Sequence, residues 1–241
     1  MPHSTKHHNK VVKVPWRSIL SSKVVAAHLA CMASTYFTIG ITTCFLPIYF
    51  RDELQLPIAY NGLFTATPFV AQIVSKLIIA AIIDWCKKHH GLSHTTAAKI
   101  CQAIMGCGSA SMLFAFPFSR SHVLTFIILI VWGSTSTLFV IGAYNTMTMI
   151  APRFTGSIAG LHALVGAIFQ LASTLLFSAF TWMEVSSKFH FSFGIAACGV
   201  ATTAAVYIAW GTAEVQPWAT DDQIVLKDKR KESKGEPLLG P

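Results

Sequence analysis

The sequence predicts an all-α membrane protein with six transmembrane helices, and three observations support this fold class. Of its 241 residues, 53% are hydrophobic and only 12% are charged, and the mean hydropathy of +0.56 is too high for an ordinary soluble domain. The apolar residues form runs of about 20 or more, the length that crosses a bilayer as a helix. The basic residues gather between alternate runs, as in the loops of multi-pass membrane proteins.

Each predicted helix is one apolar run that ends at charged residues, proline or glycine. The six runs cover residues 24–50, 61–83, 96–118, 123–150, 156–180 and 189–210. Between the fourth and fifth runs, Pro152 is followed at once by Arg153, which predicts a tight hinge between two helices. The chain therefore divides into a basic cytosolic segment (1–23), a six-span transmembrane domain (24–210) and a charged cytosolic tail (211–241) that we expect to be disordered.

The distribution of Lys and Arg predicts the orientation in the membrane. An even number of spans puts both ends of the domain on one side. Only Arg51, Arg120 and Lys188 fall on the opposite side, Lys76 lies within the second run, and every other Lys and Arg falls on the side of the termini. Because segments rich in Lys and Arg stay in the cytosol, we expect both termini and a loop at residues 87–99 to be cytosolic.

Charge and motifs exclude several classes of function. The net charge of +8 comes from the loops and ends, without the basic stripe interleaved with aromatic residues that binds nucleic acid, so the lipid bilayer is the expected partner and nucleic acid is not. The six cysteines form no C-x-x-C pair, and His89, His90 and His94 lack further ligands at metal-binding spacing, so we expect no metal and no cofactor. No P-loop, nucleophile elbow or H-E-x-x-H motif is present, and we expect no enzymatic activity.

Two ionisable residues inside predicted helices are candidates for a substrate or ion pathway. Lys76 lies in the middle of the second run, where a charge facing lipid would cost about 2.5 kcal/mol or more, so it should face a polar cavity or a partner. His162 lies in the fifth run and could bind or relay a proton near neutral pH. The alternative for His162 is a structural hydrogen bond to a neighbouring helix.

Hydroxyl and amide side chains mark two further helices. Each set recurs at helical spacing and so forms one polar face on its helix: Thr35, Thr38 and Thr42 in the first run, and Ser134, Thr137, Asn145 and Thr148 in the fourth. Such a face either lines a water-filled path or joins helices by hydrogen bonds.

Other residues suggest gating or packing. Asp84, Pro152 and Arg153 are interpreted as gating or structural residues at the cytosolic ends of the spans. The G-x-x-x-G spacing of Gly156 and Gly160 predicts close packing of the fifth helix against a neighbour.

Five short motifs resemble one transporter family. They are VPWRSIL at residues 14–20, LPIY at 46–49, NGL at 61–63 followed by Pro68, IAPRF at 150–154 and EVQPWA at 214–219. In this order they resemble the C-terminal half of the organic-anion and sodium–phosphate cotransporter family of the major facilitator superfamily, which includes sialin and the vesicular glutamate transporters. The resemblance implies a six-helix half-bundle and an anion symporter that works by alternating access with Na⁺ or H⁺ as coupling ion. It also implies a plasma membrane, vesicle or lysosome membrane as the location.

The chain departs from this family in two motifs. Met147, Thr148 and Met149 stand where the family commonly has His-Leu-Asp, so we do not expect cation coupling of the family's kind at this site. Thr35 stands where glutamate-transporting members have an arginine, and we expect Lys76 to supply the positive charge for an anion instead.

Two hypotheses for the function follow. Transporters of this superfamily have twelve spans in two halves with the substrate between them, whereas six spans are predicted here. In the first hypothesis the chain is a half-length secondary transporter of small organic or inorganic anions, which pairs with an N-terminal transporter half or with a second copy of itself. In the alternative it is a non-transporting membrane interaction protein or an inactive fragment of a truncated transporter gene.

Overall fold

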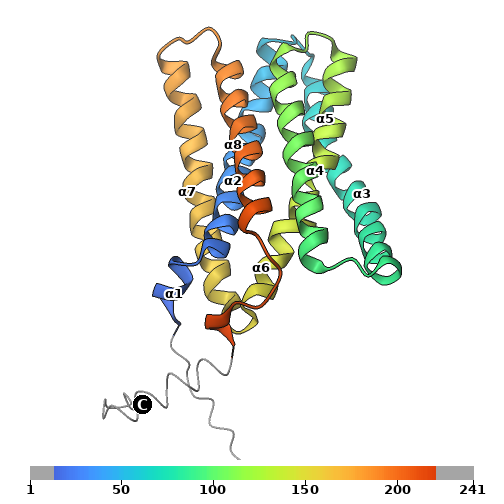
Figure 1. Ribbon diagram of the computed structural model, residues 1–241. Coiled ribbons are helices and arrows are strands. Elements are labelled where there is room, and N and C mark those ends of the chain that lie inside the picture. Colours follow the sequence, from blue (N-terminus) through green and yellow to red (C-terminus); the bar gives the residue numbers. More distant parts are fainter. Residues whose placement is uncertain (1–13, 221–241) are drawn as a thin grey trace, which may run out of the picture.

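Six helical crossings make up the described part of the chain, residues 14–220 of a computed structural model (Figure 1). Five crossings are the single helices α2 (Lys23–Asp52), α3 (Ile58–His90), α4 (His94–Ala115), α7 (Thr155–Trp182) and α8 (Lys188–Trp210). The fourth crossing consists of α5 (His122–Ser136), the π-helix η2 (Val140–Tyr144) and α6 (Asn145–Ile150). All six crossings are long and apolar enough to span a membrane, and the predicted all-α membrane fold is confirmed.

Four short helices complete the described chain. α1 (Trp16–Leu20) precedes α2, η1 (Phe116–Phe118) extends α4, η3 (Pro152–Phe154) joins α6 to α7, and η4 (Pro217–Ala219) follows α8. The hinge predicted at Pro152 and Arg153 is therefore confirmed as a single 3-10 turn. Residues 1–13 of the predicted basic segment and residues 221–241 of the predicted tail lie outside the described residues.

The loop predicted at residues 87–99 is mostly helix, and its predicted extent was wrong. α3 runs on to His90 and ends at Gly91, whose φ of 61° is the left-handed conformation that terminates many helices. α4 begins after its N-cap Ser93, whose side chain accepts a hydrogen bond from the backbone N–H of Thr96 at 3.1 Å. The Lys and His side chains in the last turn of α3 suit the negative end of the helix dipole, which favours the longer helix.

Small residues allow the helix backbones to approach closely. α2 packs against α7 and α8, α4 packs against α5 and α8, and α3 packs mainly against α5. A Cβ added at Gly133 of α5 would lie 2.4 Å from the carbonyl oxygen of Pro68 in α3. A Cβ added at Gly106 of α4 would lie 2.4 Å from the Cβ of Ala204 in α8. These two glycines therefore set the separation of the helices that they join.

The close packing predicted at Gly156 and Gly160 is wrong for the described chain. Both glycines are exposed, and a Cβ added at either would meet nothing within 4 Å. The face that α7 turns into the bundle carries Ile158, His162 and Gly166, which are all buried. The spacing of two glycines predicts a narrow helix surface, but it does not say which neighbour faces that surface.

Three of the five motifs that resemble the transporter family, VPWRSIL, IAPRF and EVQPWA, meet at one end of the bundle, while LPIY and NGL meet at the other, where the side-chain amide of Asn61 donates to the carbonyl oxygen of Pro47 at 2.9 Å. Ile19 of α1, Ile150 and Phe154 at the hinge and Ala219 of η4 belong to one buried apolar cluster. The backbone N–H of Gln216 donates to the carbonyl oxygen of Ile150 at 2.8 Å, which ties the segment after α8 to the hinge. Both ends of the described chain therefore lie at the same end of the bundle, as six crossings require (Figure 1).

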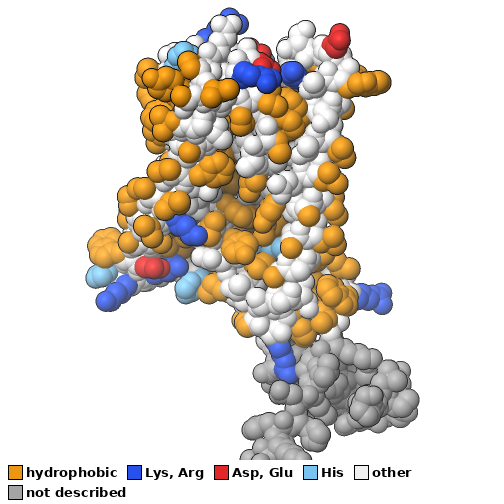
Figure 2. Space-filling model, turned by 180° about the vertical axis from the view of Figure 1, so that it is seen from behind, with side chains coloured by type: hydrophobic (Ala, Val, Ile, Leu, Met, Phe, Trp, Pro, Cys, Tyr) orange, Lys and Arg blue, Asp and Glu red, His pale blue; other side chains and the backbone are white. Residues whose placement is uncertain are grey.

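Two helices turn most of their side chains outward. In its most apolar stretch, α3 has 6% of its residues buried and α7 has 17%, against 56% in α2. Large exposed side chains such as Leu77 and Ile78 of α3 and Leu164 and Ile168 of α7 cover the outward surfaces. Figure 2 shows hydrophobic side chains over most of one face of the molecule, with Lys and Arg mainly toward its two ends. These surfaces suit contact with lipid acyl chains or with another apolar protein.

Candidate functional site

Lys76 is an exposed cation in the apolar part of α3. It lies among the exposed side chains of Ile73, Leu77 and Ile78, and it forms no ion pair or hydrogen bond with any residue between 14 and 220. Asp84, at the polar end of the helix, is eight residues away, which is about 12 Å along the axis. Because Cβ bonds tilt toward the N-terminus of a helix, the lysine side chain leads away from that nearer polar end. Reaching water by snorkelling toward it is therefore unfavourable.

The amide of Gln72 and the carboxylate of Asp84, on either side of Lys76 along α3, are engaged elsewhere. The carboxylate Oδ1 of Asp84 lies 3.8 Å from the Nζ of Lys87, one turn further on, in an exposed ion pair. The side-chain amide of Gln72, one turn before Lys76, donates to the Oγ of Ser136 in α5 at 2.9 Å. The hydroxyl of Thr137 donates to the carbonyl oxygen of Gln72 at 3.3 Å. These bonds fix α3 against α5 and so fix the position of Lys76, while the predicted gating role of Asp84 stays a prediction.

The two threonines predicted in the first span have different surroundings. Thr38 is buried, and its hydroxyl donates to the carbonyl oxygen of Ser34 at 2.9 Å within the same helix. Thr35 is half-buried, and its hydroxyl oxygen is enclosed without a hydrogen-bond partner in the described part of the chain. The link from α2 to α8 is made instead by the hydroxyl oxygens of Ser34 and Thr203, which are 2.7 Å apart. Thr35 is therefore the member of this face that keeps hydrogen-bonding capacity for a ligand or water.

The fourth span does not present the single polar face predicted for it. After α5 the chain passes through a turn at Thr137 and then the π-helix η2, which holds an extra residue in its turn. One extra residue rotates everything that follows by about 100° around the helix axis. Before the π-helix Ser134 is half-buried, and after it Asn145 is exposed, whereas Thr146 points into the bundle and is buried. The prediction assumed a regular helix, and so it selected Asn145 and missed Thr146.

The hinge residues Pro152 and Arg153 are both exposed. They line a shallow groove together with Val215, Ala219 and Thr220 at the end of the described chain. Pro152 and Arg153 are not next to Lys76 in the bundle. Lys76 belongs to α3, which packs mainly against α5, whereas the hinge joins α6 to α7. Their interpretation as gating or structural residues stays a prediction.

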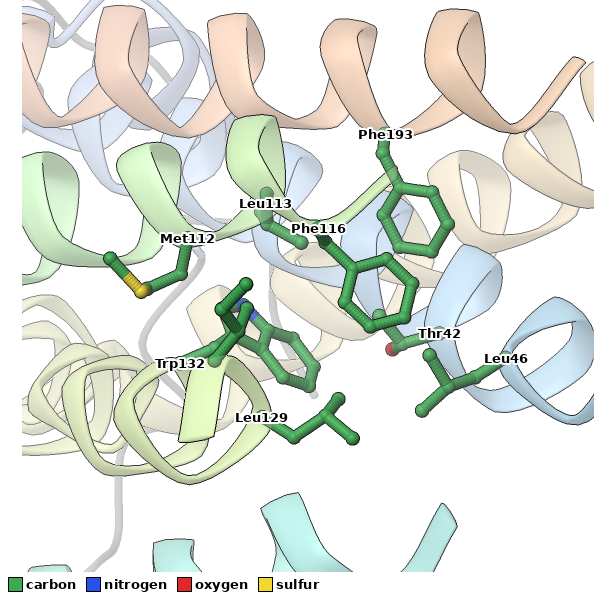
Figure 3. Close-up of a pocket in the computed structure, with 9 residues that line it drawn as sticks. Thr42, Leu46, Met112, Leu113, Phe116, Leu129, Trp132 and Phe193 are labelled. Carbon is green, nitrogen blue, oxygen red and sulfur yellow. The ribbon is translucent and has the colours of Figure 1, made fainter. Parts of the chain in front are cut away.

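The core between α2, α4, α5 and α8 encloses a void that is too small for an anion. Its volume is about 10 Å³, and Leu46, Phe116, Leu129 and Trp132 lie around it (Figure 3). A void of this size holds at most about one water molecule. Figure 3 shows two polar groups in its lining: the hydroxyl of Thr42 donates to a carbonyl oxygen of its own helix at 2.9 Å, and the indole N–H of Trp132 is buried without a hydrogen-bond partner in the described part of the chain. The exposed face that carries Lys76 is therefore a better candidate for an anion site than this core.

His162 lies where α2, α6, α7 and α8 meet. It is 2% exposed, and both of its ring nitrogens are buried without a hydrogen-bond partner among the described residues. Its ring centroid is 6.4 Å from that of His28 in α2, with 22° between the ring planes. His28 is also buried, and its Nδ1 and Nε2 lie 2.8 Å from the carbonyl oxygen of Val24 and 3.0 Å from the Oγ1 of Thr146. The hydroxyl oxygen of Tyr207 lies 2.6 Å from the same Oγ1.

The sequence pointed to His162 but not to His28, Thr146 or Tyr207. A signal for His28 was present, because an ionisable residue inside an apolar run of a membrane helix is a candidate functional residue. No such signal was available for Thr146 and Tyr207. Thr146 is 118 residues from His28 and 61 residues from Tyr207, and one sequence does not state which faces of distant helices meet.

Comparison with known proteins gives matches to membrane transporters. The chain is 26% identical over 227 residues to the "Uncharacterized transporter slc-17.3" of Caenorhabditis elegans, which covers 92% of this chain and 42% of that protein. It is 27% identical over 217 residues to vesicular glutamate transporter 3 of Danio rerio, covering 86% of this chain and 35% of that protein. It is 26% identical over 221 residues to vesicular glutamate transporter 2 of Homo sapiens, covering 88% and 36% of the two chains. No family model matches the chain.

The matches agree with the fold and with the motifs. The chain spans less than half the length of these relatives, and its described residues form six helices that are long and apolar enough to span a membrane, which is the number in one half of a major facilitator superfamily transporter. The resemblance predicted from the motifs is therefore confirmed: the chain is similar to vesicular glutamate transporters over most of its length, and its fold is consistent with a six-helix half of such a protein.

Proposed function

We propose that this chain forms one wall of a transport path for small organic or inorganic anions. The observation that carries the proposal is Lys76, an exposed cation within the apolar part of α3 that no described residue neutralises. A lysine held against lipid is costly, so the face of α3 that carries it should meet a watery cavity or a partner surface. The names of the relatives support the class of ligand, because glutamate is a small anion and those proteins are called glutamate transporters.

The charge of Lys76 would act on an anion at short range. In the interior of a membrane protein the effective dielectric constant is far below that of water, so one cation in a cavity attracts a bound anion strongly. Lysine presents a compact ammonium without the planar fork of arginine, and we expect phosphate or a small carboxylate to bind with loose geometric selection. Thr35, which keeps an unused hydroxyl, is a candidate to line the same path.

Transport by this chain would require a second wall. In the proposed mechanism of alternating access, two six-helix bundles rock against each other around a site between them, driven by a Na⁺ or H⁺ gradient. The outward faces of α3 and α7, with few buried residues, are the surfaces that suit such a partner. The partner is either an N-terminal transporter half or a second copy of the chain. The membrane is that of the cell surface, a vesicle or a lysosome.

Binding of radiolabelled phosphate and glutamate to the purified chain in lipid nanodiscs tests this proposal. We expect saturable binding of at least one of these anions to the wild type and its loss in Lys76→Gln, with an unchanged thermal unfolding temperature. The matched control is Lys88→Gln, which removes an exposed cation of the same helix outside the apolar stretch and should bind like the wild type. Lys76→Arg keeps the charge and should retain binding.

Two outcomes would contradict the proposal. If Lys76→Gln binds both anions as the wild type does, the lysine is not the anion-holding charge. If Lys76→Gln lowers the unfolding temperature and Lys76→Arg restores it without any anion binding, the lysine is a structural contact. The second outcome would favour a membrane interaction protein, for which the exposed apolar surfaces of α3 and α7 are the supporting observation.

A further inference from the structure

A chain of buried hydrogen bonds links three helices around His28. The hydroxyl of Tyr207 in α8 lies 2.6 Å from the Oγ1 of Thr146 in α6, and this oxygen lies 3.0 Å from the Nε2 of His28 in α2. At the other side of the imidazole ring, Nδ1 lies 2.8 Å from the carbonyl oxygen of Val24. His28, Thr146 and Tyr207 are all buried, at 1%, 3% and 0% exposure. The cluster is therefore a closed network and not a patch of the surface.

The partners of His28 determine where the hydrogens lie when its ring is neutral. A carbonyl oxygen only accepts hydrogen bonds, so the Nδ1 of His28 must carry the hydrogen that is donated to Val24. The Nε2 then has a free electron pair, and it accepts the hydrogen of the Thr146 hydroxyl. Tyr207 in turn donates its hydrogen to the Oγ1 of Thr146. Every polar group of the network has a partner in this state.

The same atoms also accommodate a charged His28. An added proton on Nε2 turns this nitrogen into a donor, and Thr146 must then accept from it. The hydroxyl of Thr146 no longer needs the Nε2 of His28 as an acceptor, because the Thr146 oxygen also lies 3.0 Å from the carbonyl oxygen of Gly142 and 3.2 Å from that of Ala143. Its Oγ1 accepts from both His28 and Tyr207 while its hydrogen points to one of these carbonyls. Only the Thr146 hydroxyl rotates, and no heavy atom needs to move.

The π-helix explains why these groups are aligned. Gly142 and Ala143 belong to η2, and the extra residue of this segment rotates Thr146 into the bundle toward His28. The single π-helical segment of the described chain therefore supplies both the switching hydroxyl and the carbonyl oxygens that accept from it. Short π-helical segments inside α-helices are frequent at functional sites.

The other titratable groups around the cluster limit it to one proton. His162 of α7 stacks at 6.4 Å, so two charged rings would repel each other in a buried site. Tyr207 of α8 is already a member of the network, and Cys31 of α2 and Cys101 of α4 are the buried thiols that interact with it. No Lys, Arg, Asp or Glu of the described chain is buried, so no permanently charged side chain faces His28 and His162 from inside the bundle.

We propose that His28 is a reversible proton-binding site, in which the Thr146 hydroxyl switches from donating to Nε2 to accepting from it and so keeps both protonation states of His28 hydrogen-bonded. The ligand is a single proton, and the charged state strengthens the contact between α2 and α6 because hydrogen bonds from a charged donor are stronger than neutral ones. This inference stands on the geometry of the cluster and does not depend on anion transport.

Nuclear magnetic resonance of the full chain with ¹⁵N-labelled histidine, in detergent or nanodiscs, tests the proposal between about pH 5 and pH 8. The signals of His28 are assigned by their loss in His28→Gln among the 10 histidines of the chain. We expect the His28 ring to show a neutral form with hydrogen on Nδ1 at high pH and a doubly protonated form at low pH. Thr146→Val should weaken proton binding at His28 by about tenfold, which is a midpoint lower by about one pH unit.

The control variants separate the switch from a general loss of packing. Thr146→Ser keeps the hydroxyl and should retain the wild-type titration, while Thr148→Val removes an exposed hydroxyl of the same helix and should leave it unchanged. Unfolding temperatures identify any variant that has lost its fold. The proposal is overturned if His28 keeps one protonation state across the range, or if Thr148→Val shifts the titration as much as Thr146→Val does.

Discussion

At the scale of single residues, a buried hydroxyl that connects two helices stabilises the fold by donating a hydrogen bond to a buried carbonyl oxygen. Tyr49 of α2 is 2% exposed, and its hydroxyl lies 3.3 Å from the carbonyl oxygen of Phe116 and 3.2 Å from that of Ser119. These two carbonyls end the third crossing, where the α-helix has become a 3-10 turn. The tyrosine therefore supplies a donor to backbone groups that the helix itself leaves incomplete.

We predict that Tyr49→Phe destabilises the chain by about 0.5–1.5 kcal/mol, because the ring still packs while the carbonyl oxygens of Phe116 and Ser119 lose the hydroxyl hydrogen that they share, and only that of Phe116 keeps a backbone donor among the described residues, the N–H of Ser119 at 3.1 Å. The free energy of unfolding in detergent, measured by a denaturant titration, gives the value. Tyr60→Phe is the matched control, since Tyr60 is 57% exposed and its hydroxyl makes no hydrogen bond to the described chain. Equal losses of stability in the two variants would show that the hydrogen bond contributes nothing.

The sequence could identify unusual residues but not their partners. Lys76 and His162 were recognisable because ionisable side chains are rare inside apolar runs. The same criterion could have selected His28. It could not select Thr146, because threonine is common in membrane helices and its role here depends on contacts with residues far away in the sequence.

At the scale of helices, the closest backbone contact of α3 decides how firmly this exposed helix is attached. α3 contacts α5 where Gly133 meets the backbone of Pro68, and an added Cβ would lie between 2.4 and 3.0 Å from three backbone atoms of Pro68. A backbone cannot rotate away as the end of a side chain can. Any side chain at position 133 must therefore push the two helices apart.

We predict that Gly133→Ala destabilises the chain by about 1–3 kcal/mol, the usual cost of overpacking a tight contact. Gly160→Ala is the control, because nothing lies within 4 Å of its added Cβ, and its effect should stay within about 0.5 kcal/mol. Thermal unfolding followed by circular dichroism measures both. A neutral Gly133→Ala would mean that α3 is not held at this distance from α5.

The six spans were predictable because apolar length alone specifies a crossing, whereas their internal geometry was not. Hydropathy does not reveal the π-helix in the fourth crossing, because an inserted residue changes the direction in which the following side chains point and not the apolar character of the helix. It also ended the second span at residue 83, although α3 continues through its Lys and His residues to His90. Charged residues mark the end of the apolar stretch, but the helix can continue beyond them.

At the scale of the whole molecule, the chain is an uneven bundle. α2 is surrounded by other helices, while α3 and α7 expose most of their apolar surface, so the chain offers large surfaces to lipid or to a partner. Three of the motifs that resemble the transporter family, VPWRSIL, IAPRF and EVQPWA, cluster at the end that holds both ends of the described chain. The His28 network lies near that same end, about 8 Å along α2 from its first residue.

The side of the membrane that this end faces decides which compartment supplies the proton to His28, and the charge distribution predicts the cytosol. In a background where the exposed or half-exposed Cys44, Cys86, Cys107 and Cys198 are replaced by serine, single cysteines at Glu53→Cys and His90→Cys mark the loop that precedes α3 and the last residue of α3. Both positions are exposed in the structure.

We expect an impermeant maleimide applied to the cytosolic face of sealed membrane vesicles to label His90→Cys and to spare Glu53→Cys. Applied to the opposite face, the reagent should give the reverse pattern, because α3 crosses the membrane once. The buried Cys31 and Cys101 should remain unlabelled in both experiments and so provide an internal control for the fold. Labelling of His90→Cys from the non-cytosolic face would invert the bundle, and the proton-binding site at His28 would then sense the lumen or the exterior.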